Sequence, residues 1–144
     1  MAADDDQIGD EGSIAIFYRN ASNTAQWDFI KKITVLDTDA GDNLGASIAL
    51  DGDHLIAGAN LDDESASNAG AAYVFYRNQG GADNWGQVSK LTAVTGNASD
   101  NFGVSVAISG DYAVVGDHIW FSTFSPGGSW RRVFHSTDRE IGRA

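Results

Sequence analysis

Residues 42–103 decide the fold, because this stretch opens with Asp42-Asn43-Leu44-Gly45 and closes with Asp100-Asn101-Phe102-Gly103. The two signatures are 58 residues apart, since 100 − 42 = 58. The motif Phe17-Tyr18-Arg19-Asn20 returns as Phe75-Tyr76-Arg77-Asn78 with the same offset, 75 − 17 = 58. A constant period of this length indicates a repeat architecture.

The offset holds without a gap from Asp4 to Gly116. Residues 42–99 therefore form one complete unit, residues 1–41 the last two strands of a preceding unit, and residues 100–144 a partial, divergent terminal unit. The 144 residues correspond to about two and a half units of this period. Because Met1 falls opposite Ala59, in the middle of a unit, we expect the chain to be a piece of something longer or one share of an assembly.

The complete unit contains four short apolar runs, rich in Val, Ile, Tyr and Phe and without a helical period. We expect strands at residues 46–50, 54–57, 71–77 and 85–91, with partial copies at 13–19, 27–36, 104–108 and 112–115. The first two runs flank Asp51-Gly52, which suits a tight hairpin turn. Residues 72–76 are continuously apolar, so both faces of the sheet should be covered. Four antiparallel strands with two buried faces describe a blade of a β-propeller, here an incomplete one in an all-β chain.

Composition excludes several functions. The net charge of −11 argues against nucleic-acid binding, which depends on Lys and Arg at phosphates. With no cysteine, disulfides, thiolate zinc sites and cysteine nucleophiles are excluded. No apolar run approaches the length of a membrane span.

The repeated signature resembles the FG-GAP repeat, which occurs in the N-terminal propeller of integrin α chains and in bacterial and algal surface proteins. The match rests on Phe102-Gly103 followed by Val104–Gly116, and on Leu44-Gly45 followed by Ala57-Gly58-Ala59. The positions that carry the signature are Asp42, Leu44, Gly45, Gly58, Asp100, Phe102, Gly103 and Gly116. The resemblance implies a non-enzymatic interaction or adhesion module outside the cell or at its surface.

Integrin-type repeats can hold calcium in a longer Asp-rich loop between the first two strands of a blade. Here that connection is only Asp51-Gly52-Asp53 or Ser109-Gly110-Asp111, too short to wrap an ion that takes six to eight oxygens. Other loops offer better carboxylates for Ca²⁺. These candidates are Asp4, Asp5 and Asp6 in the first copy and Asp62, Asp63 and Glu64 in the second. The alternative is that these residues cap turns or remain solvated.

Other residues have a structural and a functional interpretation. We expect Asp42 and Asp100 to bond turn amides at the start of the first strand. Trp27 and Trp85 suit a sugar-stacking platform, although packing with a satisfied N–H is the more usual role. Asn20 and Asn97 begin glycosylation sequons, which matter only in a secreted eukaryotic protein.

Three functions are compatible with these features. The first is the interaction or adhesion module, stabilised by calcium if the acidic loops bind it. The second is a self-assembling subunit whose ring or filament is completed by neighbouring chains, because closed propellers use roughly four to eight blades. The third is a carbohydrate-binding, lectin-like propeller. No convergent catalytic set favours an enzyme; Gly45-Ala46-Ser47 begins like a nucleophile elbow but lies in an expected strand.

Overall fold

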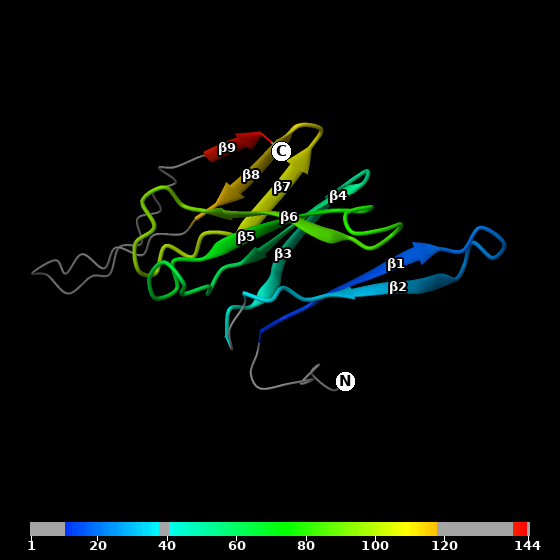
Figure 1. The fold of residues 1–144 in the computed structure, drawn as a ribbon, viewed down its shortest axis with the longest axis horizontal. Helices are drawn as coiled ribbons and strands as arrows, with labels where there is room; N and C mark the ends of the chain where they lie inside the picture. Colours follow the sequence, from blue (N-terminus) through cyan, green and yellow to red (C-terminus); the bar gives the residue numbers. More distant parts are fainter. Residues whose placement is uncertain (1–10, 38–40, 118–139, 144) are drawn as a thin grey trace, which may run out of the picture.

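The structure is a computed structural model that describes residues 11–37, 41–117 and 140–143. Every regular element in these ranges is a β-strand, and they contain no helix with the length and apolar content to cross a membrane. The strands are β1 (Ile14–Arg19), β2 (Trp27–Ile33), β3 (Leu44–Asp51), β4 (His54–Ala59), β5 (Ala71–Tyr76), β6 (Gly86–Thr92), β7 (Ser105–Ser109), β8 (Tyr112–Gly116) and β9 (Glu140–Arg143). They form three antiparallel sheets, β1-β2, β3-β4-β5-β6 and β7-β8-β9 (Figure 1). The prediction of an all-β chain of propeller blades is confirmed.

The central sheet is a complete blade in which each strand pairs with the next one along the chain. Asp51 pairs with His54, so the predicted hairpin forms, and Gly52 adopts a φ of 55° that a tight turn requires. The apolar run in β5 is buried on both faces, as its composition predicts: Tyr73 and Phe75 are exposed by 0% and 1%, and Ala72 and Val74 by 0% and 4%.

The flanking sheets repeat parts of the central blade at the 58-residue offset. β1 and β2 correspond to the third and fourth strands of a blade, and β7 and β8 to the first and second. Irregularities repeat as well: a bulge lies at Ile16/Phe17 between β1 and β2 and at Val74/Phe75 between β5 and β6. The backbone structure therefore repeats with the same 58-residue period as the sequence. Of the divergent tail that begins at His118, residues 118–139 and 144 lie outside the described residues, and residues 140–143 form β9, which pairs with β8.

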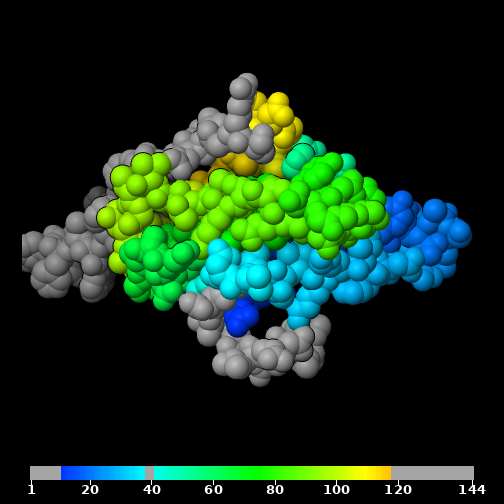
Figure 2. All heavy atoms as spheres, in the orientation of Figure 1, coloured from blue at the N-terminus to red at the C-terminus, as the bar shows by residue number. Residues whose placement is uncertain are grey.

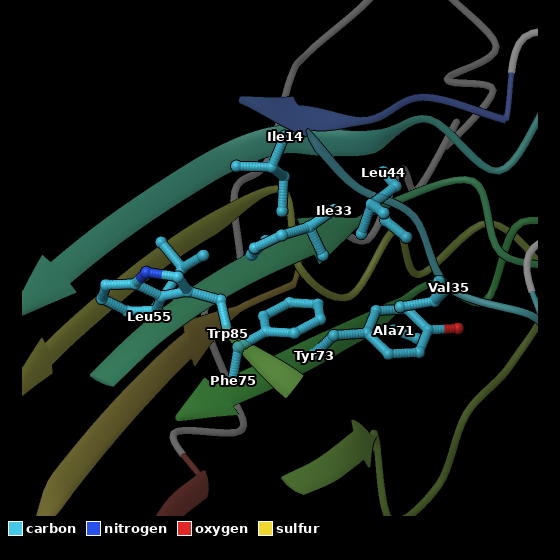
Figure 3. Packing of buried hydrophobic residues seen from close by; sticks show 11 residues of the cluster. Ile14, Ile33, Val35, Leu44, Leu55, Ala71, Tyr73, Phe75 and Trp85 are labelled. Atoms are coloured by element: carbon cyan, nitrogen blue, oxygen red, sulfur yellow. The ribbon is translucent and has the colours of Figure 1, made fainter. Parts of the chain in front are cut away.

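Two apolar clusters hold the sheets together, one on each face of the central blade. On one face, Ile14 and Ile33 of the first sheet and Val35, which follows β2, pack with Leu55, Tyr73, Phe75 and Trp85 (Figure 3). On the other, Ile56, Ala72 and Val74 pack with Phe102, Ala113 and Val115. The central blade has both faces covered because it has a neighbour on each side.

Identical residues at equivalent positions differ in burial. Phe75 is 1% exposed and Trp85 6%, whereas Phe17 is 53% exposed and Trp27 61%. Phe17 and Phe29 contact each other edge to face, with ring centroids 5.7 Å apart. The contrast follows from the neighbours: Phe75 and Trp85 face the first sheet, and β5 also pairs with β4. Among the described residues, nothing covers the equivalent face of the first sheet, and no strand takes the place of β4 beside β1.

This contrast predicts the cost of truncating each ring. Phe75→Ala should lower the free energy of unfolding by about 3–5 kcal/mol, because it leaves a cavity between two blades. Phe17→Ala should cost less than about 1 kcal/mol when the chain is monomeric, because its ring is half exposed. Urea denaturation of both variants at low protein concentration measures the difference. Equal losses would contradict the packing described here.

Candidate functional site

The junction between the central and last sheets is a backbone contact made possible by a glycine. The Ser47 hydroxyl donates a hydrogen bond of 2.7 Å to the Gly103 carbonyl oxygen. A Cβ on Gly58 would lie 1.9 Å from that oxygen, so no other residue fits beside it without moving the blades apart. Gly58 and Gly103 are the two signature glycines of successive repeats, and the structure brings them together.

The signature loops form a second backbone contact, and it repeats between both pairs of sheets. Gly12 bridges to Leu44 and Gly70 bridges to Phe102, each pair shifted by 58 residues. The Leu44 amide donates to the Glu11 carbonyl and the Phe102 amide to the Ala69 carbonyl, both at 2.9 Å, and these acceptors lie just before β1 and β5. A Cβ on Gly70 would lie 2.2 Å from the Phe102 oxygen. The signature residues therefore make the backbone contacts that connect one blade to the next.

The two signature aspartates are buried: Asp42 is 4% exposed and Asp100 is 5% exposed. The Asp100 carboxylate accepts a 2.7 Å hydrogen bond from the Asn97 amide, which agrees with the predicted role at a turn. The Asp42 carbonyl accepts from the Leu61 amide at 3.3 Å. These contacts fix the loops that lead into β3 and β7.

The glycine junction predicts a position-specific effect of one added methyl group. Gly58→Ala should destabilise the protein by about 3 kcal/mol, because the added Cβ overpacks a backbone contact. Gly96→Ala is the matched control: its Cβ would meet nothing closer than 3.5 Å, so stability should change little. Thermal and urea denaturation of both variants provide the measurement, and a tolerated alanine at Gly58 would contradict the junction.

The acidic loop after β4 is organised by a lysine from β6. The Lys90 ammonium lies 3.0 Å from an Asp62 carboxylate oxygen, 3.4 Å from an Asp37 oxygen, and also pairs with Glu64. The Tyr73 hydroxyl donates to Asp62 at 3.0 Å. Asp37 follows β2 of the first sheet, so Lys90 links two blades as well as the loop.

Burial and charge shift two pKa values in this cluster. Burial raises the pKa of the Tyr73 phenol far above its ordinary value, and the neighbouring Asp62 charge adds to the increase. Burial lowers the pKa of Lys90, but its hydrogen bonds to Glu64, Tyr73 and Asp62 outweigh this effect and raise the pKa overall. Tyr73 therefore remains neutral and Lys90 charged through the physiological range.

The predicted metal candidates fall in two groups. Asp4, Asp5 and Asp6 lie outside the described residues. Asp62 is buried at 1% exposure, while Asp63 and Glu64 are exposed. Among the described residues, no three His, Asp or Glu side chains are arranged to hold a metal ion, and the Lys90 ammonium lies between the carboxylates. As arranged, this loop does not fit Ca²⁺, and calcium binding by it stays a prediction.

Removing the Lys90 ammonium from its carboxylate partners should destabilise the folded protein. Lys90→Met should lower stability by about 3 kcal/mol, because it leaves the buried Asp62 carboxylate without its counter-ion. The double variant Lys90→Met/Asp62→Asn should recover part of this loss, because no buried charge remains unpaired. Urea denaturation of the two single variants and the double variant gives the coupling. Strictly additive losses would contradict a shared cluster.

The pH dependence gives a second measurement of the same cluster. Because the folded-state pKa values of Lys90 and Tyr73 are both raised, the stability they contribute is present below about pH 10 and is lost as pH rises above it. The Tyr73→Phe variant lacks one of the two titrating groups. Its free energy of unfolding should therefore fall less steeply between pH 9 and about 11 than that of the unmodified chain.

The structure separates the candidate ligand residues. Trp85 is packed at 6% exposure and Trp27 is 61% exposed, so they do not form one stacking platform. The Trp85 Nε1 has no hydrogen-bond partner among the described residues, which differs from the expected satisfied N–H. The Asn20 amide donates to Asp28 at 2.6 Å, and Asn97 is exposed in the loop after β6. Sequence reasoning missed the role of Tyr73 and Lys90 in this cluster. Lys90 repeats Lys32 at the 58-residue offset, whereas Tyr73 corresponds to Ala15, so the period gave no signal for the pair.

The backbone joint, the blade order and the repeated register define a protein built of propeller blades. The sequence model of the FG-GAP repeat matches residues 27–75 and 85–123, more than half of the chain. The two matches begin at Trp27 and Trp85, again one period apart, and the first runs from β2 across the junction to β5. No curated protein and no solved structure matches the chain.

The chain therefore belongs to the FG-GAP repeat family. Repeats of this family build propeller-type protein-interaction modules, are generally non-enzymatic, and are typical of extracellular or surface proteins.

Proposed function

We propose that this chain is a non-enzymatic adhesion module that binds other proteins outside the cell or at its surface. Its family membership carries the proposal, because FG-GAP repeats are typical of surface proteins and of propeller-type interaction modules. The fold adds a physical reason. The faces of the central blade are used for cohesion between blades, so its loops are the part left to meet a partner.

The loops after β4 and β6 provide the binding surface in this proposal. They lie together at one edge of the blades, opposite the β3-β4 and β7-β8 turns (Figure 1). The Ser99 amide donates to the Ser67 carbonyl at 2.9 Å, which ties the two loops together. Asp63 and Glu64 are exposed there, and the whole chain has a net charge of −11. An acidic loop edge favours a partner with a basic surface.

A protein array tests the proposal. Purified chain should bind one or more immobilised extracellular matrix proteins, and binding should weaken at high salt. The variant Asp63→Lys/Glu64→Lys should raise the Kd at least tenfold by reversing charge at the loop edge. Asp111→Lys is the control for charge reversal elsewhere, because Asp111 is also exposed and lies in the β7-β8 turn at the opposite edge.

Three outcomes contradict the proposal in different ways. Binding to no protein on the array removes adhesion. Equal loss in the Asp111→Lys control places the binding surface elsewhere. Binding to a glycan array instead of the protein array favours the lectin-like alternative, for which the exposed Trp27 is the residue to replace.

Calcium is a separate part of the proposal. For Asp62 and Glu64 to bind Ca²⁺, Lys90 has to leave them. Binding to the folded state would then raise Tm as millimolar calcium replaces EDTA, and the rise would be larger in Lys90→Met, where the carboxylates have no competing ammonium. An unchanged Tm in both proteins removes calcium and leaves the adhesion module in place.

A further inference from the structure

In the described residues, the first sheet presents an unpaired edge along β1, at a place where the central blade has a paired one. β1 pairs with β2 on one side, and in the described residues no strand pairs along its other side. In the central blade, the equivalent strand β5 lies between β4 and β6. A free edge of this kind is a template for another strand. The missing neighbour is a hairpin equivalent to β3 and β4.

Exposed apolar residues mark the surface that such a hairpin would cover. Ile48 and Leu50 in β3 are 51% and 60% exposed. Their repeat equivalents Val106 and Ile108 pack against the central blade and are partly buried. Ile48 and Leu50 are thus exposed because the sheet that precedes them lacks its first two strands in the described part of the chain.

The opposite end of the chain carries the complementary surface. At the internal junction, β7 packs against Ala49 and Ile56, and Ser47 and Gly58 hold the Gly103 carbonyl. The residues 58 positions later in the sequence are of the same or similar types. Ala107 and Val114 correspond to the packing residues Ala49 and Ile56, and Ser105 and Gly116 correspond to Ser47 and Gly58 at the backbone joint. Val114 is 41% exposed, since no described sheet follows it.

We propose that a second copy of this chain docks its β7-β8 hairpin against β1, so that two chains build one blade. β8 of one copy would pair with β1 of the next, in the register that β4 and β5 already use. The Ile56↔Val74 and Leu55↔Phe75 pairs then predict Val114↔Ile16 and Ala113↔Phe17 between copies. Ser105 of the docked copy would donate to the Gly45 carbonyl, as Ser47 does to Gly103.

The same docking accounts for the exposed aromatic rings. Phe75 and Trp85 are covered by Ile14, Ile33 and Val35 of the neighbouring sheet. The repeat equivalents of these three residues are Ala72, Leu91 and Ala93. In the assembly, Leu91 and Ala93 of the docked copy would cover Phe17 and Trp27, which are half exposed or more in the single chain. Each copy would contribute two blades, and closure at roughly four to eight blades takes two to four copies.

β9 competes for this docking. Its backbone pairs with Tyr112 to Val115 of β8, the same edge that β1 of another copy would use. β9 therefore has to leave β8 before the composite blade forms. The single chain blocks its own assembly edge, and association should depend on concentration rather than be complete at all concentrations.

Sedimentation equilibrium of the full chain over a wide concentration range tests the proposal. Association into a discrete oligomer is expected. Leu50→Lys and Val114→Lys, one at each end of the interface, should each weaken association at least tenfold. Both side chains are exposed in the single chain, so circular dichroism should show unchanged folding. Val94→Lys is the matched control, since Val94 is 80% exposed in the loop after β6 and outside the interface. A monomer at all concentrations, or equal weakening by the control, overturns the proposal.

Two further variants test the register and the role of β9. The chain has no cysteine, so Ile16→Cys/Val114→Cys should form disulfide-linked oligomers under oxidising conditions, while either single cysteine should give dimers at most. Ile141→Pro removes a backbone donor from β9 and should strengthen association by freeing the β8 edge. Absence of linked oligomers overturns the β8-β1 pairing, and unchanged or weaker association of Ile141→Pro overturns competition by β9. None of these readouts depends on an adhesion partner.

Discussion

The close backbone approach between neighbouring blades is the constraint on which the structure depends. Gly58 lets the Gly103 carbonyl come near enough to accept the Ser47 hydroxyl, and a side chain at this position would prevent it. One such hydrogen bond contributes only about 1 kcal/mol. Its importance is geometric, because it sets the spacing and register at which Ile56 and Val74 meet Ala113 and Val115. The burial of that apolar surface supplies most of the cohesion.

Cohesion between blades makes the environment of a residue depend on its neighbours in the array. The backbone around Phe17 repeats the backbone around Phe75, including the bulge beside it. One ring is nevertheless exposed by 53% and the other by 1%. The Phe-Tyr-Arg-Asn motif and the bulge are the same at the two places. What differs in the described residues is the surroundings: Phe75 has a covering sheet and β4 beside its strand, and Phe17 has neither. A repeat protein of this kind is stabilised by its interfaces more than by its individual sheets.

Much of the fold could be predicted from the sequence, because a gapless period fixes equivalent positions without knowledge of contacts. The continuous apolar run in β5 predicted two covered faces, and Asp51-Gly52 predicted the hairpin. The exposure of Trp27 was not predictable from its own repeat, since its equivalent Trp85 is buried. The place of β9 beside β8 was also missed, because residues 140–143 no longer follow the repeated pattern closely.

The acidic loop shows why a cluster of carboxylates in a sequence does not specify a metal. Asp62 and Glu64 have the chemistry that hard cations prefer. What they bind in the fold depends on the strand that lies beside the loop, and this is set by register: Lys90 pairs with Tyr73 across β5 and β6, which places its ammonium next to Asp62. A shift of one residue would point Lys90 to the other face of the sheet and leave the carboxylates without a counter-ion. The bulge at Val74/Phe75 lies directly beside this pair. The pairing of two strands, more than the loop composition, therefore decides whether these carboxylates meet an ammonium or remain available to another cation.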